Sequence, residues 1–121
     1  MSVESTIRAY FEAFEASDST ALANLFTDDG VIAPLDMATI SGQAAIKETF
    51  DGFFGAVSVR CEELTFDRIV ERGDTAFVET HSTERVVNRE TSAAETARFR
   101  ELFCLQRGDG GWRVASYMFN H

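Results

Sequence analysis

One carboxylate in the sequence falls where large apolar side chains are expected. Two apolar runs flank the glycine-rich turn at 108–111, which predicts a β-hairpin over residues 98–120 with Glu101 in its first strand. Period-two alternation places Glu101 on one strand face with three large apolar side chains, those of Phe99, Phe103 and Leu105. Because a buried charge is costly unless it is paired, hydrogen-bonded or neutralised, Glu101 is a candidate protonated donor or acid/base group in a pocket.

Two structural explanations of Glu101 stay open beside the functional one. The side chain could form a buried ion pair, for which Arg85 and Arg113 are candidate partners. It could also lie on the open face of the sheet, where a carboxylate could pair across a dimer contact. The sheet face that Glu101 occupies therefore decides between a site and an interface.

Three further side chains could take part in proton transfer, each with a plain structural alternative. Tyr10 could donate a hydrogen bond into a cavity, or be a core tyrosine with its hydroxyl at the rim. Asp36 could be a general base at the pocket mouth, or an ordinary loop aspartate. His81 could be an acid/base group, because histidine titrates near neutral pH, or a strand histidine paired with Glu79 or Arg85.

The chain is rich in phenylalanine, with 11 residues beside one tryptophan and two tyrosines. Such a set predicts an aromatic interior that is either a solid core or the wall of a cavity for a flat or aliphatic ligand. The candidate ligand-binding residues are Phe14, Phe50, Phe54, Phe103, Trp112 and Tyr117, with Phe53 beside them.

The sequence shows no pattern for a metal or a cofactor. The two cysteines, Cys61 and Cys104, match no zinc or redox spacing and are expected to be buried free thiols. Only two histidines are present, and one of them is His121, so no spaced set of metal ligands is visible. We therefore expect neither a metal nor a cofactor.

Charge and hydropathy limit the expected partners and location. The 121 residues carry a formal net charge of −9, which disfavours nucleic acid and anionic membranes as partners. No apolar run approaches the roughly 20 residues of a membrane span. The first residues lack the pattern of a signal peptide, so we expect a cytoplasmic protein.

The apolar periodicities predict an α+β domain over residues 1–121. Helical spacing is expected at 5–16, 20–26 and 43–54, with Ser5 as a cap and Gly30 as a left-handed residue after the second helix. Strands are expected at 31–35, 57–72, 75–87 and in the hairpin 98–120, with a bulge at 61–63. Pro34 predicts that the first strand lies at an edge or ends there. The expected architecture is a cone-shaped curved antiparallel sheet with three N-terminal helices packed on its concave face.

Nearly the whole chain resembles a known superfamily. Residues 25–31 (LFTDDGV) and 41–46 (SGQAAI) are similar to the nuclear-transport-factor-two-like superfamily, which includes ketosteroid isomerases and SnoaL-like polyketide cyclases. Residues 73–82 (GDTAFVETHS) and 100–120 look closest to the SgcJ/EcaC-type branch of SnoaL-like proteins. The resemblance implies the cone fold, a hydrophobic small-molecule ligand and a homodimer formed through the open sheet face. Enzymes and non-enzymes share this fold, so the resemblance fixes no reaction.

The ketosteroid isomerases, distant relatives by this resemblance, imply roles for particular residues. Their oxyanion tyrosine precedes an aspartate by eight residues, as Tyr10 precedes Asp18 here. Their second oxyanion donor is a carboxylic acid kept neutral by an apolar site, and Glu101 falls near that position. Their general base falls at about Pro34 in this sequence, where the nearest carboxylate is Asp36.

Two functions follow as hypotheses. In the first, an apolar pocket binds a polyketide- or steroid-like molecule for isomerisation or cyclisation by proton transfer. Tyr10 and Glu101 would then stabilise an oxyanion while Asp36 or His81 moves the proton. In the second, the chain is a non-catalytic dimeric binding or accessory module of the same fold, which the proline at the base position favours.

Overall fold

Three helices and six strands make up the chain, and the computed structural model describes all residues from 1 to 121. The helices are α1 (Val3–Glu15), α2 (Ser19–Asn24) and α3 (Gln43–Ala56). The strands are β1 (Phe26–Ala33), β2 (Ile40–Ser41), β3 (Val57–Arg72), β4 (Thr75–Asn88), β5 (Ala94–Gly108) and β6 (Gly111–Asn120).

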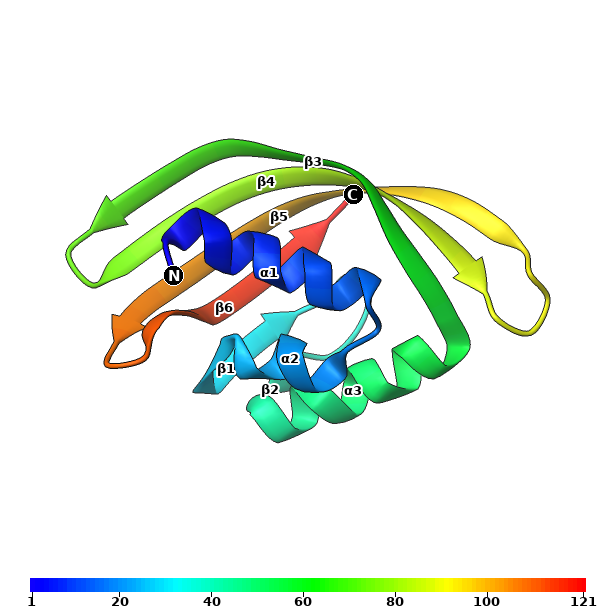
Figure 1. Cartoon of the computed structure of the whole chain (residues 1–121), viewed down its shortest axis with the longest axis horizontal. Helices are drawn as coiled ribbons and strands as arrows, with labels where there is room; N and C mark the ends of the chain where they lie inside the picture. Colours follow the sequence, from blue (N-terminus) through cyan, green and yellow to red (C-terminus); the bar gives the residue numbers. More distant parts are fainter.

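All six strands form a single curved sheet in the order β2-β1-β6-β5-β4-β3. Strands β3 to β6 form the predicted antiparallel meander. The sheet bends around α1, and α2 and α3 close the open end below it (Figure 1). The predicted α+β architecture is therefore confirmed, with one difference in detail: β1 pairs with β6 in parallel, so the sheet is mixed.

Helix α1 begins earlier than its apolar spacing predicted. The cap is Ser2, whose side chain accepts a hydrogen bond from the backbone N–H of Ser5, so the prediction of Ser5 as the cap is wrong. The buried face of the helix has the expected spacing and includes Ile7, Tyr10 and Phe14. This face turns Tyr10 towards the middle of the sheet.

The first strand is longer than its apolar run suggested, because it begins at Phe26 and includes the acidic segment before Gly30. Gly30 does not adopt a left-handed conformation, so its predicted role as a cap is wrong. A Cβ atom there would lie 3.0 Å from Cβ of Phe26, so Gly30 is needed for close packing. The strand ends at Ala33, immediately before Pro34, as predicted.

Strand β3 contains the predicted bulge, because its pairing with β4 shifts register between Cys61 and Glu63. A second shift follows between Phe66 and Arg68. Irregularities of this kind increase the bend of long strands, and they help the sheet to curve over the helices. None of the three helices is long and apolar enough to cross a membrane.

Candidate functional site

Glu101 lies on the concave face of the sheet, in the middle of β5. Its neighbours in register are Thr80 on β4 and Phe119 on β6, and Phe103 follows it on the same face. The residue is only 4% exposed. Of the two faces considered for it, Glu101 therefore occupies the one that packs against the helices.

The carboxylate of Glu101 is bound by hydroxyl groups and by no cation. The Thr80 hydroxyl lies 2.7 Å from Oε1, and the Ser82 hydroxyl lies 2.6 Å from Oε2. The side chain takes part in no ion pair, so the pairing with Arg85 or Arg113 considered above is absent. Burial raises the pKa of Glu101, although the two hydroxyl contacts oppose this effect.

A second buried carboxyl group, that of Glu84, lies close by on β4. It is 5% exposed, and its Oε1 is 3.4 Å from the Ser82 hydroxyl that also contacts Glu101. Burial, followed by the charge of Glu101, raises the pKa of Glu84 to about 7. The concave face therefore holds two glutamates with one serine hydroxyl between them, and Glu84 titrates near neutral pH.

Sequence reasoning missed Glu84, although a signal was present. Residues 76, 78, 80, 82 and 84 alternate with the exposed residues of β4 and share one face. His81, the candidate named on this strand, lies on the other face. Because Ala76 and Val78 are apolar, this parity could have identified Thr80, Ser82 and Glu84 as inward-facing.

Tyr10 reaches the same region from α1 and meets Tyr117 of β6. The ring centroids of the two tyrosines are 5.2 Å apart, and Phe103 stacks on Tyr117 with 4.2 Å between centroids. Burial raises the pKa of both hydroxyls, and the charges of Glu84 and Glu101 raise it further. Both tyrosines therefore stay neutral at physiological pH, and each hydroxyl can donate a hydrogen bond to an acceptor.

The other two proton-transfer candidates lie away from this cluster. His81 points to the opposite, convex face, where its Nδ1 lies 2.9 Å from the carboxylate of Asp67. This partner is neither Glu79 nor Arg85, and hydrogen bonding to Asp67 raises the pKa of His81. Asp36 lies in the exposed loop between β1 and β2 with a φ of 57°. The structure thus brings together Tyr10 and Glu101, but neither Asp36 nor His81.

The candidate ligand-binding aromatic residues form two groups that share a boundary at α1. In the first group, Phe103 and Tyr117 pack around Tyr10. Trp112 is buried near the start of β6. The α3 residues pack with Phe14 at the other end of α1, and Phe53 stacks on Phe14 at 5.8 Å. The second group contains Phe14, Phe50, Phe53 and Phe54. Apart from Phe53, which is 37% exposed, both groups belong to the apolar core or pack against it.

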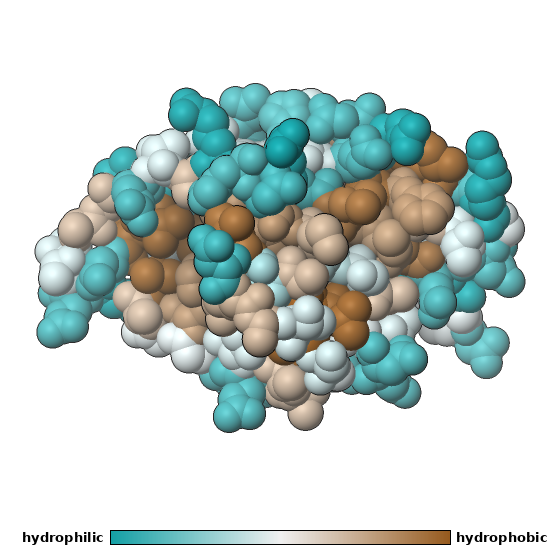
Figure 2. Space-filling view, turned by 180° about the vertical axis from the view of Figure 1, so that it is seen from behind, coloured by the Kyte–Doolittle hydropathy of each residue, from teal (hydrophilic) through white to brown (hydrophobic).

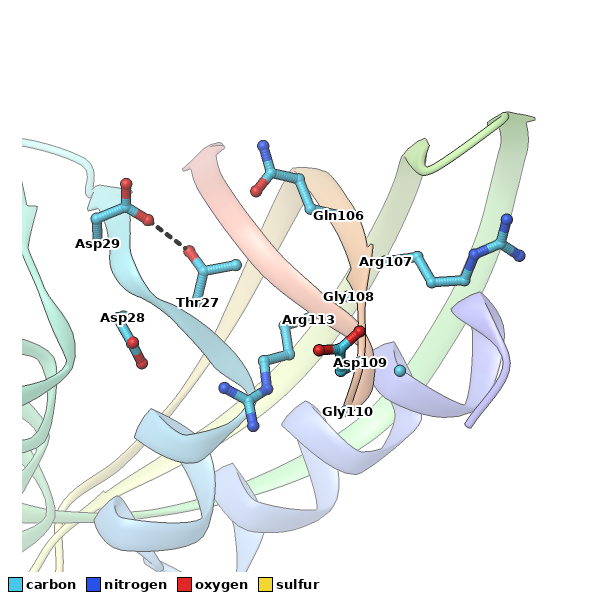
Figure 3. Close-up of a pocket in the computed structure, with 10 residues that line it drawn as sticks. Thr27, Asp28, Asp29, Gln106, Arg107, Gly108, Asp109, Gly110 and Arg113 are labelled. Carbon is cyan, nitrogen blue, oxygen red and sulfur yellow. Dashed lines mark hydrogen bonds between the residues drawn. The ribbon is translucent and has the colours of Figure 1, made fainter.

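Two hollows on the surface are polar and lie outside the buried cluster. One, of about 670 Å³, lies between the start of β1 and the β5–β6 turn (Figure 3). In it, Thr27 donates to Asp29, and Arg113 points between the two segments, while Arg107 turns away and pairs with Asp74. The other, of about 380 Å³, includes His81, Arg98 and Arg100 on the convex side.

The cysteines and histidines form no metal centre. Cys61 and Cys104 are free thiols that are partly buried, which is more exposed than predicted. Cys61 faces Glu84 across the β3–β4 pair, and burial together with the nearby glutamates raises its pKa to about 11. No three His, Cys, Asp or Glu side chains come together in a way that could hold a metal ion.

Solved structures share this fold over most of their length. A ketosteroid isomerase-like protein from Erwinia carotovora atroseptica is 27% identical, with a TM-score of 0.89 and coverage of 97% of this chain and 91% of that protein. A conserved protein from Planctomyces limnophilus is 21% identical, with a TM-score of 0.87 and coverage of 96% and 90%. An NTF2-like protein with a cystatin-like fold from Novosphingobium aromaticivorans is 22% identical, with a TM-score of 0.77 and coverage of 97% and 77%.

Sequence comparison gives the family directly. No curated protein matches the sequence at a significant level. The family profile of the SnoaL-like domain matches residues 7–115, a range that begins within α1, ends within β6 and includes both buried glutamates. The chain belongs to the SnoaL-like domain family.

Proposed function

We propose that the chain binds a small apolar molecule containing a carbonyl group, of polyketide or steroid type, and catalyses an isomerisation or cyclisation by proton transfer. Glu101 moves the proton, and the neutral hydroxyl of Tyr10 donates a hydrogen bond to the developing oxyanion. The likeness to a protein described as ketosteroid isomerase-like supports this reaction class.

The observation behind this proposal is the pair of buried glutamates without a cation. Taking a carboxylate out of water costs several kcal/mol, and an apolar residue of similar size would make a more stable core. Carboxyl groups that are desolvated and lie beside a second carboxyl group occur preferentially at functional sites. Glu101 and Glu84 have both properties, and neither contributes an ion pair to the fold.

The aromatic side chains around Tyr10 provide the apolar walls in this proposal. In the unliganded chain the rings of Tyr10, Phe103 and Tyr117 pack against one another in front of Glu101. Because Glu101 is only 4% exposed, a ligand must displace neighbouring side chains to reach the carboxylate. In this proposal the ligand enters between the end of α1 and β3, where the exposed Glu15 and the partly buried Cys61 lie near Glu84.

Exchange of carbon-bound hydrogen for deuterium tests proton transfer without knowledge of the natural substrate. The protein is incubated in D₂O with a panel of flat, enolisable ketones, and loss of the proton next to the carbonyl group is followed by NMR. We expect exchange that Glu101→Gln lowers about 10²- to 10⁴-fold, because the amide keeps the shape of the side chain but accepts no proton. Glu95→Gln, at an exposed position on the same strand, should exchange like the wild type.

Binding is measured separately by the shift in thermal midpoint that each ketone causes. A midpoint raised equally in wild type and Glu101→Gln, together with equal exchange rates, would show binding without catalysis by Glu101. If no ketone raises the midpoint and none exchanges, the proposed function is refuted.

The convex face supports a second candidate, the non-catalytic dimeric module. Three large apolar side chains lie exposed on it: Phe77 at 45%, Leu102 at 38% and Met118 at 54%. Leu102 of β5 pairs with Met118 of β6 in register, and Phe77 of the adjacent strand β4 lies diagonally opposite Leu102, so the three are neighbours. The view from behind Figure 1 shows brown apolar areas between teal hydrophilic residues (Figure 2). Clustered exposed apolar residues favour an interface, here with a second copy of the chain.

Sedimentation of the wild type and of Leu102→Lys tests this second candidate. Leu102→Lys should dissociate a dimer, because it places a charge in the middle of the apolar contact. At high dilution, where both proteins are monomers, the variant should have the same thermal midpoint as the wild type. Lys substitution at Met37, an exposed apolar residue in the β1–β2 loop, is the matched control. A wild type that sediments as a monomer at all concentrations would exclude the homodimer.

A further inference from the structure

The hydroxyl of Ser82 lies between the two buried glutamates and has only one proton to donate. It lies 2.6 Å from Oε2 of Glu101 and 3.4 Å from Oε1 of Glu84. If both carboxyl groups were ionised, only one of them could receive that proton, and two negative charges would face each other in the core. A single proton on either glutamate removes both problems.

The contacts of Glu101 indicate which glutamate holds this proton. Both of its oxygens are already in short contact with hydroxyls, since Thr80 contacts Oε1 at 2.7 Å and Ser82 contacts Oε2. A carboxylate that accepts two such hydrogen bonds is stabilised in its ionised form. Glu84 has only the longer contact with Ser82, so nothing comparable stabilises its anion.

We propose that Glu84 is a positioning residue that holds the proton of the buried pair and, through Ser82, keeps Glu101 ionised as the base. The protonated carboxyl of Glu84 donates to Oγ of Ser82, and Ser82 then donates to Oε2 of Glu101. Nothing in this arrangement is oxidised or reduced. The unliganded pair contains one proton, and a second is present only while Glu101 holds the proton taken from the substrate. The inference rests on the proposed function in assigning the base, but the location of the proton is a property of the unliganded protein.

The groups that face Glu84 favour its protonated form. They come from four other elements, namely Tyr10 and Glu15 of α1, Cys61 of β3, Glu101 of β5 and Tyr117 of β6. The two tyrosines and the thiol are neutral at physiological pH, and the remaining two groups are carboxyls. The surroundings of Glu84 therefore contain negative charge and no cation, which opposes its ionisation.

Carboxyl NMR titration locates the proton without any substrate. The side-chain carboxyl carbons of glutamate are labelled with ¹³C, and their shifts are followed from acid to alkaline pH in wild type, Glu84→Gln and Glu101→Gln. We expect one carboxyl in the wild type to titrate near neutral pH and this step to disappear in Glu84→Gln. In Glu101→Gln the step should persist and move to lower pH, because the charge that opposes ionisation of Glu84 is gone. Glu95→Gln should leave it unchanged.

Ser82→Ala provides a second test that avoids altering either carboxyl group. Removing the Ser82 hydroxyl takes one hydrogen-bond donor from Glu101, so the titration of the Glu101 carboxyl should move up by roughly one to two pH units.

Two results would overturn the proposal. A near-neutral step that disappears in Glu101→Gln and persists in Glu84→Gln would place the proton on Glu101. The absence of any near-neutral step would leave no proton for Glu84 to hold. If the titration is as expected but no ketone exchanges its protons, the proposed function fails and the location of the proton stands.

Discussion

The burial of Glu84 makes the stability of the fold depend on pH in a way that one substitution should remove. The pKa of Glu84 rises from its ordinary value of 4.5 to about 7 in the folded chain. A carboxyl whose pKa is higher in the folded chain binds more protons there between these two values. The free energy of unfolding therefore falls as pH rises through this window, and Glu84→Gln should abolish that contribution.

The size of the effect follows from the shift. One pKa unit corresponds to about 1.36 kcal/mol, so the full change is about 3.4 kcal/mol, of which about 2.5 kcal/mol falls between about pH 5 and pH 8. For a domain of this size, 2.5 kcal/mol corresponds to a change in thermal midpoint of about 10 °C. Relative to Glu84→Gln, the wild type should lose this amount of stability on going from acid to alkaline conditions.

Urea unfolding at a series of pH values measures this difference directly. The variant, the wild type and Glu95→Gln are compared at equal ionic strength, and the unfolding free energy of Glu84→Gln is subtracted at each pH. Glu95→Gln should parallel the wild type, because it alters an exposed carboxylate. Parallel curves for the wild type and Glu84→Gln would refute the reasoning, since they would mean that Glu84 ionises equally easily in the folded and unfolded chain.

Three further predictions concern the core, the first strand and the convex face. Phe103→Ala should lower the free energy of unfolding by about 3 to 5 kcal/mol in urea, because the ring is fully buried and stacked; a loss below 1 kcal/mol would contradict this packing. Gly30→Ala should cost about 1 to 3 kcal/mol, since the new methyl group would clash with Phe26, and equal stability would show that β1 adjusts freely. Asp67→Asn should lower the pKa of His81 in an NMR titration, and an unchanged value would exclude the pairing.

Most of the fold could be predicted because the apolar periodicity was strong. The boundaries of β3 were predicted at 57–72 and observed at Val57–Arg72, since the turn at Gly73 and the end of α3 are both marked in the sequence. The start of β1 was misplaced, because its first residues include two aspartates, which are uncommon in strands. Pairing with β6 and the close packing of Gly30 on Phe26 override that local preference.

The residues of the candidate site were predicted only in part, because the sequence does not show which face of β4 is buried. Tyr10 and Glu101 are brought together from opposite ends of the chain, as the resemblance implied, because α1 crosses the middle of the sheet. The candidate on β4 was His81, which lies on the convex face, whereas Glu84 lies on the concave face. Which face of a strand is buried depends on where the helices pack, and that cannot be read from the strand alone.

Under the proposed function, the acid pair gives a reason for an unliganded interior that is closed. A water-filled cavity around Glu101 would hydrate the carboxylate and lower its pKa towards that of an exposed glutamate. Packing of Tyr10, Phe103 and Tyr117 keeps water away, while Thr80 and Ser82 supply the hydrogen bonds that ionisation requires. An apolar ligand that displaces these rings would also keep water away from the carboxylate of Glu101. The base would then meet its substrate in the same low-dielectric surroundings, where a proton transfer gains most from fixed hydroxyl donors.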